Sequence, residues 1–76
     1  MTSHTDPAKT EHVERTIRTC ALALHSSGEL RHLAAEMGVT TKVFRRWWTR
    51  GRVPKVKAEW LEKRFPDVVV ASTLVG

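Results

Sequence analysis

Basic side chains are concentrated in one stretch of this 76-residue chain, between residues 42 and 57. That stretch contains no acidic residue and seven basic ones: Lys42, Arg45, Arg46, Arg50, Arg52, Lys55 and Lys57. The other sixty residues hold 6 basic and 8 acidic groups, so the formal net charge of +5 comes from this local patch. Guanidinium and ammonium groups bind phosphate oxygens, and arginine also bridges the two acceptors of guanine. The patch therefore predicts a surface that binds a polyanion.

Other residue patterns give no support for catalysis or metal binding. Cys20 is the single cysteine, so no intramolecular disulfide and no cysteine-based metal cage can form. The four histidines match no zinc-ligand motif: His4, His12, His25 and His32. No Ser/His/Asp set, paired-carboxylate motif or glycine-rich phosphate loop is visible. We therefore expect no catalytic residue, no metal, no cofactor and no small-molecule substrate.

Aromatic residues lie inside the basic patch, in the run KVFRRWWTRGRVP of residues 42–54. At about 100° per helical residue, apolar side chains fall on one side and polar ones on the other. The apolar side holds Val43, Phe44, Trp47 and Trp48, and the opposite side holds Lys42, Arg45, Arg46 and Thr49. A platform that stacks unpaired bases needs aromatic and basic groups on one face, so this pattern disfavours it. Trp48 has two open interpretations, which are an extension of the core and an exposed contact for a partner.

Hydrophobic spacing predicts four helices that position this patch. The first runs for about 15 residues from Glu11, and Ser26-Ser27-Gly28 ends it. The second covers residues 30–37, the third residues 41–50 and the fourth residues 55–64.

Residue types at the helix ends support these bounds. Gly38 and Gly51 suit the left-handed position that follows a helix. Thr40 is a good N-cap for the third helix. Ser26 and Glu29 have the spacing of a capping box before the second.

The last part of the chain combines a clear helix with an ambiguous tail. Pro54 fits the first turn of the fourth helix, and three of its residues are expected to face inward: Val56, Trp60 and Leu61. The tail DVVVASTLVG favours a strand by its valines, but a lone strand has no partner in a helical domain. We prefer a short last turn over residues 72–75, and the strand remains the alternative.

The whole pattern predicts one compact all-α domain of four to five helices over residues 11–76, preceded by a disordered arm over residues 1–10. The N-terminus lacks the order of a signal peptide, and no apolar run approaches the roughly 20 residues that span a bilayer. We expect a cytoplasmic protein that does not bind membranes.

The segment LRHLAAEMGVTTKVFRRW resembles the helix-turn-helix of Cro-type phage repressors and their bacterial relatives, which have the lambda-repressor-like fold. The matching positions are Ala34, Gly38 and Val39, followed by the packing positions Val43, Phe44 and Trp47. The continuation WWTRGRVP is similar to the W-x-x-x-G-x-[IV]-P ending of small Cro-like and YdaS-like regulators. The resemblance covers about residues 26–66, and it departs from the common pattern at Trp48, where relatives usually carry a polar residue.

This resemblance implies the sites on the chain. The base-reading positions of the family fall on Thr40, Thr41, Lys42, Arg45, Arg46 and Thr49. The basic residues that follow are expected to contact phosphate: Arg50, Arg52, Lys55 and Lys57. Thr40 has an alternative role as a helix cap only, and Arg46 has one as a phosphate contact.

The function that the resemblance implies is sequence-specific binding of double-stranded DNA by a phage or prophage repressor, in a bacterial cell or an infected host. One motif covers few base pairs, so we expect a homodimer on two half-sites. Its interface is expected to include Trp60, Val68, Val70 and Leu74. The alternatives are an excisionase or small terminase subunit on the same fold, and a protein-binding antitoxin or anti-repressor.

Overall fold

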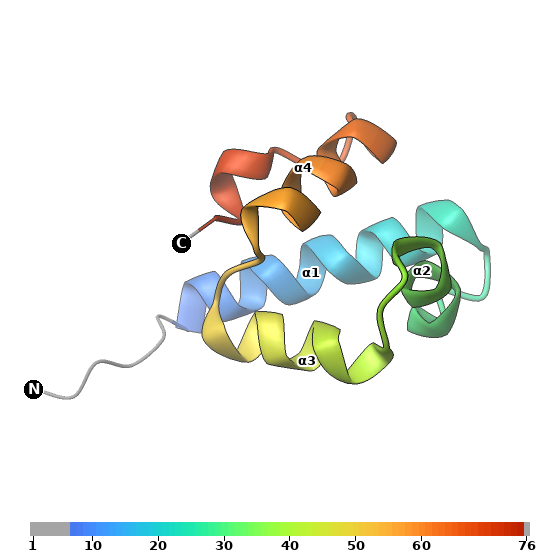
Figure 1. Ribbon diagram of the computed structural model, residues 1–76, viewed down its shortest axis with the longest axis horizontal. Helices are drawn as coiled ribbons and strands as arrows, with labels where there is room; N and C mark the ends of the chain where they lie inside the picture. Colours follow the sequence, from blue (N-terminus) through green and yellow to red (C-terminus); the bar gives the residue numbers. More distant parts are fainter. Residues whose placement is uncertain (1–6, 76) are drawn as a thin grey trace, which may run out of the picture.

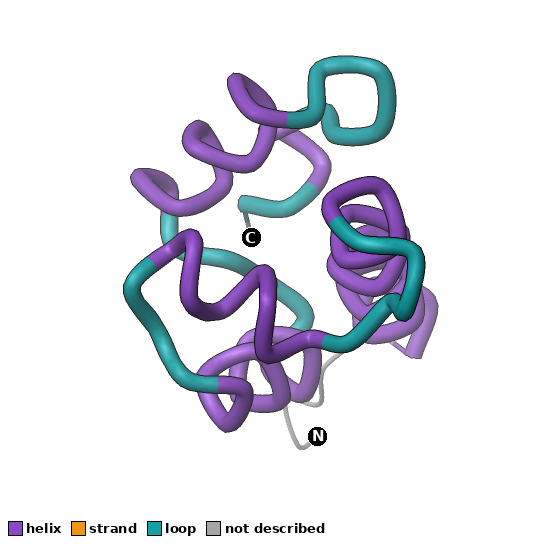
Figure 2. The backbone as a smooth tube through the Cα atoms, turned by 90° about the vertical axis from the view of Figure 1, so that its right-hand side faces the viewer, coloured by secondary structure: helices purple, strands orange, loops and turns teal. Residues whose placement is uncertain are grey.

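The described chain, residues 7–75 of a computed structural model, consists of helices joined by short loops (Figures 1 and 2). The elements are α1 (Pro7–Leu24), α2 (Leu30–Met37), α3 (Thr41–Arg50), α4 (Lys55–Arg64) and a 3-10 helix, η1 (Ala71–Thr73). No strand occurs within these described residues. The prediction of an all-α chain is therefore confirmed, and the tail forms a short helical turn rather than a strand.

Three of the four predicted helices have the expected bounds, but α1 begins earlier than predicted. Its first residue is Pro7, so the expectation of disorder is wrong for residues 7–10, and residues 1–6 lie outside the described chain. Proline suits the first turn of a helix because its fixed φ matches helical backbone. The Lys9 ammonium also donates a hydrogen bond to the Thr73 carbonyl over 2.9 Å. This bond joins the first turn of α1 to a residue far away in the sequence.

α1 is the element around which the fold is built. It packs against both α2 and α3, while α4 packs against η1. Figure 1 shows α3 on one side of α1 and α4 with the tail on the other. The buried side of α1 comprises Val13, Thr16, Ile17, Cys20 and Ala21. Burial raises the pKa of the Cys20 thiol to about 12.

Each of the two helices α2 and α3 ends at a glycine. Gly38 and Gly51 both have left-handed backbone, with φ of 71° and 74°. After Gly38, the Val39 N–H donates to the Ala34 carbonyl over 3.0 Å, and after Gly51 the Arg52 N–H donates to the Trp47 carbonyl over 3.1 Å. These bonds satisfy carbonyls that the helix end leaves free, as in a Schellman motif. The predicted stops of α2 and α3 are confirmed.

The helix starts use less side-chain capping than predicted. The N-cap of α2 is Glu29 and makes no side-chain cap bond, so the capping box with Ser26 is wrong. A side-chain contact to the backbone before α2 comes from Ser27 instead, whose hydroxyl oxygen accepts a hydrogen bond from the Glu29 N–H over 3.3 Å. Thr40 has the extended N-cap backbone before α3, but its side chain makes no cap bond.

The inner face of α4 differs from the prediction at one position. Leu61 is fully buried and Trp60 is half-buried, as expected, whereas Val56 is 73% exposed. The buried partner of Leu61 is Ala58, three residues before it. Val56 lies two residues before Ala58, so its side chain is rotated by about 200° around the helix axis from that of Ala58. It therefore points away from the core.

The C-terminal tail folds back onto the domain. The Val53 N–H donates to the Leu74 carbonyl over 2.7 Å, and the Ala71 N–H donates to a Glu62 carboxylate oxygen over 3.2 Å. The Leu74 side chain is fully buried within the chain. This contradicts its predicted place in an interface between subunits, and the reason is that the core of the monomer already uses it.

Candidate nucleic-acid interface

The two faces of α3 are separated as the sequence predicts. Phe44 and Trp47 are buried, and their rings pack edge to face with centroids 5.6 Å apart. The exposed residues of the helix are Thr41, Lys42, Arg45, Arg46, Thr49 and Arg50. Because the aromatic rings hold the inner face in the core, the basic side chains all project from the outer face.

Trp48 extends the core, which was one of the two interpretations left open. Its side chain is half-buried and packs against the core cluster. The Arg18 guanidinium of α1 lies over the Trp48 ring, 5.2 Å from its centroid. A cation over the indole face is an attractive arrangement, so this contact joins α1 to α3 at the edge of the core.

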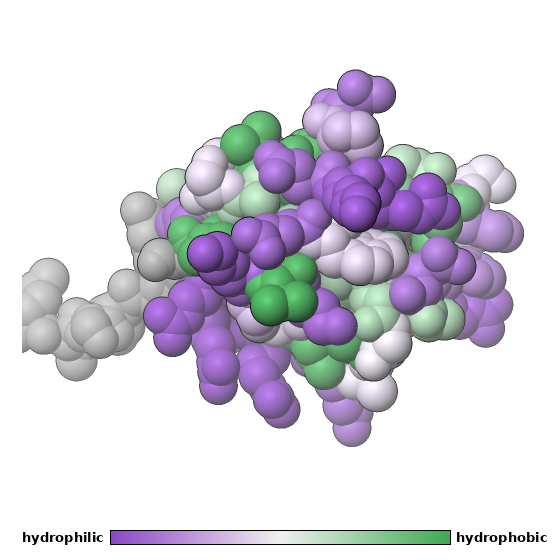
Figure 3. Space-filling view, turned by 45° about the horizontal axis from the view of Figure 1, so that its top comes forward, coloured by the Kyte–Doolittle hydropathy of each residue, from purple (hydrophilic) through white to green (hydrophobic). Residues whose placement is uncertain are grey.

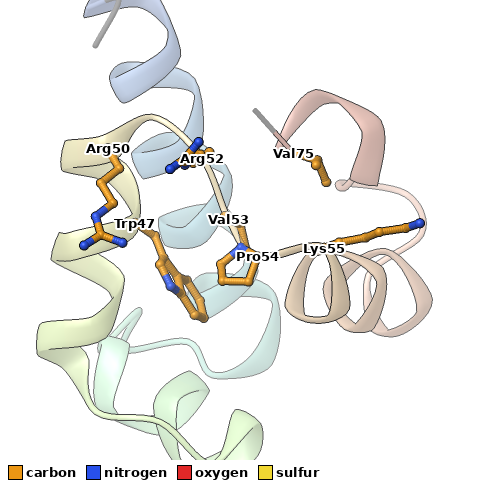
Figure 4. A pocket seen from close by; sticks show the side chains of 7 residues that line it. All are labelled: Trp47, Arg50, Arg52, Val53, Pro54, Lys55 and Val75. Atoms are coloured by element: carbon orange, nitrogen blue, oxygen red, sulfur yellow. The ribbon is translucent and has the colours of Figure 1, made fainter. Parts of the chain in front are cut away.

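A groove of about 340 Å³ lies at the C-terminal end of α3 (Figure 4). Its lining consists of Trp47, Arg50, Arg52, Val53, Pro54, Lys55 and Val75. Figure 4 shows Arg50 and Arg52 on the α3 side, whereas Lys55 extends away from Trp47 along α4. The predicted phosphate-contacting cations Arg50, Arg52 and Lys55 are therefore brought around one groove.

Lys57 is separated from that groove. Its ammonium is partly buried and donates to the Met37 carbonyl at the end of α2, over 3.2 Å. Cations are favourable at a helix C-terminus because the last carbonyls carry partial negative charge. This contact gives Lys57 a structural role that does not require phosphate.

A second hollow, of about 510 Å³, lies at the other end of α3. It is lined by Arg18, Gly28, Glu29, Leu30, Arg31, Thr41, Lys42 and Arg45. Arg18 and Arg31 were not predicted as site residues, because they lie outside the basic run and come from α1 and α2. Only the packing of the three helices brings them beside Lys42 and Arg45.

Charge pairing separates the arginines of the α3 surface from the other arginines of the described chain. Within residues 7–75, no acidic side chain forms an ion pair with six cations of α3, the linker after it and the first residue of α4: Lys42, Arg45, Arg46, Arg50, Arg52 and Lys55. We call these six residues the unpaired basic surface. The ion pairs that do form are Arg15–Glu11, Arg18–Glu14, Arg31–Glu29, His32–Glu29 and Arg64–Glu36.

Neither a metal-ligand cluster nor a membrane-spanning helix occurs among the described residues. Residues 7–75 contain no group of three or more His, Cys, Asp or Glu side chains that could hold a metal ion. The rings of His25 and His32 are stacked on each other, 4.3 Å apart. Among the helices of this part of the chain, none combines the length and apolar character needed to cross a bilayer.

Residues of the predicted subunit interface remain partly exposed, apart from Leu74. Val68 and Val70 are 38% and 55% exposed, and Trp60 is half-buried. Val56 lies one helical turn before Trp60, so both fall on the same side of α4. On the face shown in Figure 3, apolar side chains form separate groups among hydrophilic ones.

Comparison with known proteins gives no further guidance. The chain matches no protein-family model, and neither the curated proteins nor the solved structures contain a significant match to it. The resemblance to Cro-type repressors therefore rests on the motif residues between 26 and 66 alone.

Proposed function

We propose that this protein is a sequence-specific regulator that binds double-stranded DNA, with α2 and α3 as a helix-turn-helix and α3 in the major groove. The observation that carries the proposal is the unpaired basic surface on the exposed side of a helix whose other side is core. An α-helix fits the major groove of B-form DNA, and base edges there present distinct patterns of donors and acceptors. Cations without acidic partners are free to meet phosphates and bases.

The side chains of α3 divide into readers of bases and contacts to phosphate. Thr41, Lys42 and Arg45 project from the first half of the helix, and Arg46 and Thr49 from the second. Arg45 and Arg46 bridge guanine acceptors, and the threonines and Lys42 reach other base edges. Thr40, at the entrance of α3, is free to contact DNA because its hydroxyl makes no cap bond. Arg50, Arg52 and Lys55 around the C-terminal groove contact the backbone.

Regulation follows from occupancy of an operator. A bound repressor of the Cro type excludes polymerase or a competing repressor from overlapping DNA, in the cytoplasm of a bacterial cell or an infected host. Useful specificity requires two half-sites, so the proposed active form is a homodimer.

The subunit contact is proposed to include Trp60, Val68 and Val70, together with the exposed Val56. Trp60→Ala should convert a dimeric parent to a monomer, because a large aromatic anchor contributes strongly to an interface. Light scattering measures the mass, and Leu22→Ala, a change at another exposed apolar residue, is the control. A variant that stays dimeric argues against this interface.

The decisive experiment selects bound sequences from a pool of random duplex DNA and follows affinity against salt. We expect a palindromic consensus and a log–log salt slope of several units, at about 0.9 per phosphate contact. Absence of preference for any sequence would overturn the proposal. An excisionase or packaging role would also give duplex binding, and the positions of the bound sites in the genome distinguish it from repression.

One observation favours a second candidate, a protein-binding module such as an antitoxin or anti-repressor. Val56 and Val70 are 73% and 55% exposed, and exposed apolar side chains are common where another protein docks. This candidate predicts tight binding of a protein partner and weak binding of DNA at every sequence.

A further inference from the structure

The hollow at the N-terminal end of α3 combines basic side chains from three helices. Arg18 comes from α1, Arg31 from α2, and Lys42 and Arg45 from α3. We propose that this hollow, here called the N-terminal cradle, binds a backbone phosphate of the duplex, an inference that rests on the proposed function. It assigns Arg18 and Arg31 to the DNA interface.

The charges in the N-terminal cradle favour an anion. Its lining carries four cations and a single acid, Glu29. The Glu29 carboxylate is already engaged by the Arg31 guanidinium at 3.2 Å and lies 3.6 Å from the His32 ring nitrogen. Lys42 and Arg45 have no acidic partner within residues 7–75, so an incoming phosphate meets positive charge that is not neutralised.

The size of the hollow also suits a phosphate group. Its volume is about 510 Å³. A water molecule occupies about 30 Å³ in the liquid, and a phosphate has only five heavy atoms. The cradle therefore has room for a phosphodiester and for part of the sugars on either side.

Arg18 is held in position before any ligand binds. Its Nε donates to a Glu14 carboxylate oxygen over 2.9 Å, and its guanidinium lies over the Trp48 ring. Arginine has five N–H donors, so the Glu14 bond leaves the four on the terminal nitrogens for a ligand. A side chain that is already ordered loses less conformational entropy when it binds.

The N-terminal cradle and the C-terminal groove lie at opposite ends of α3. The helix has 10 residues, which at 1.5 Å per residue is about 15 Å. The major groove is about 12 Å wide. Cations at both ends of such a helix can therefore reach the phosphates of both strands that border the groove, and this would hold α3 in register.

The test compares Arg18→Gln and Arg31→Gln with Arg15→Gln on duplex DNA. Arg15 is the matched control, since it lies on α1, pairs with Glu11 four residues before it, and does not line the cradle. Each cradle variant should lower the salt slope, by at most about 0.9 for each half-site, and weaken every duplex by the same factor. The cradle variants should keep the preferred DNA sequence of the parent protein. Arg15→Gln should keep the affinity and the salt slope of the parent as well.

Further measurements separate the possible failures. Arg18→Lys keeps the charge and should restore most of the lost slope, whereas a purely structural role would not be rescued by charge. Circular dichroism melting checks that the variants are folded. Inorganic phosphate, titrated into the protein, should shift the amide resonances of Gly28 to Arg31 in an NMR spectrum, and Arg31→Gln should weaken that response.

The outcomes are distinct for the two proposals. If the parent protein binds duplex DNA but Arg18→Gln and Arg31→Gln keep its slope, the cradle is overturned and the proposed function stands. A changed base preference in the cradle variants would equally overturn the assignment to phosphate. If the parent binds no duplex at all, the proposed function fails and the cradle inference fails with it.

Discussion

The unpaired basic surface and the outer side of α1 carry the same kind of side chain in two different electrostatic settings. On α1, Arg15 and Arg18 each pair with a glutamate four residues earlier, at 3.2 and 2.9 Å. On α3, Arg45 and Arg46 have no acidic partner in the described chain. Uncompensated like charges repel one another and give the folded state nothing in return. The contrast teaches that positive charge on α3 is left uncompensated, as the proposed DNA contact requires, whereas each of these α1 arginines has a glutamate beside it and only Arg18 also reaches the N-terminal cradle.

The largest loss of DNA affinity is expected when a cation is removed from the unpaired basic surface. Arg45→Ala should cost about 1–3 kcal/mol of DNA binding and relax the preference at particular base pairs. That range corresponds to roughly 5- to 150-fold in Kd. Binding to a series of single-base variants of the selected sequence measures both effects. Equal losses on all duplexes would assign Arg45 to phosphate instead.

Placing an acidic side chain on α3 should give one of its arginines an acidic neighbour, as the arginines of α1 have. Thr49 lies four residues after Arg45, so Thr49→Glu places a carboxylate within reach of that guanidinium, in the reverse order of the α1 pairs, where the glutamate comes first. We expect stability to change by less than about 0.5 kcal/mol, because the pair has the less favourable order and the acid lies near the C-terminus of α3. Duplex affinity should fall by roughly tenfold, because the DNA then meets a carboxylate. Thr49→Gln is the uncharged control, and unchanged affinity in Thr49→Glu would show that this face does not approach DNA.

Two lysines in the first turn of α4 allow the same comparison between a cation that is engaged within the chain and one that is not. Lys57 donates to the Met37 carbonyl, whereas Lys55 has no such contact and borders the C-terminal groove. Lys57→Ala should lower the free energy of unfolding by about 1 kcal/mol, as measured by urea denaturation. Lys55→Ala should leave stability unchanged and weaken all duplexes alike, with a salt slope lower by about 0.9 for each half-site. The reverse pattern would exchange the roles assigned to the two residues.

The smallest effect is expected for the paired arginine of α1. Arg15→Ala removes an ion pair in which both side chains are 72% exposed. Such pairs contribute little, so the stability should change by less than about 0.5 kcal/mol and DNA affinity should stay the same. Urea denaturation and a binding titration at low salt provide the measurements. A clear loss of affinity would extend the DNA interface along α1 beyond Arg18.

Local signals explain why so much of the fold could be predicted from the sequence. Gly38, Gly51 and Pro54 mark helix ends by their own backbone preferences, and α2, α3 and α4 have the predicted bounds. The two faces of α3 follow from helical periodicity alone.

The errors come from contacts between residues far apart in sequence. The first turn of α1 is stabilised by Lys9 and Thr73, which no local pattern connects. Leu74 belongs to an apolar tail, which predicts an interface between subunits. It lies instead in the core of its own chain, because the tail folds back onto Val53. The N-terminal cradle was missed for the same reason, since Arg18 and Arg31 come from α1 and α2 and join Lys42 and Arg45 only when the helices pack.

The buried thiol of Cys20 provides a built-in probe of how often the core opens. With its pKa raised to about 12, Cys20 holds almost no reactive thiolate at neutral pH while the chain is folded. When the core opens, the thiol regains its ordinary acidity and can be alkylated. The rate of labelling by a thiol reagent therefore reports the population of the open state at this single position, without an introduced label. Duplex DNA that binds only the folded chain should slow that labelling in proportion to its affinity.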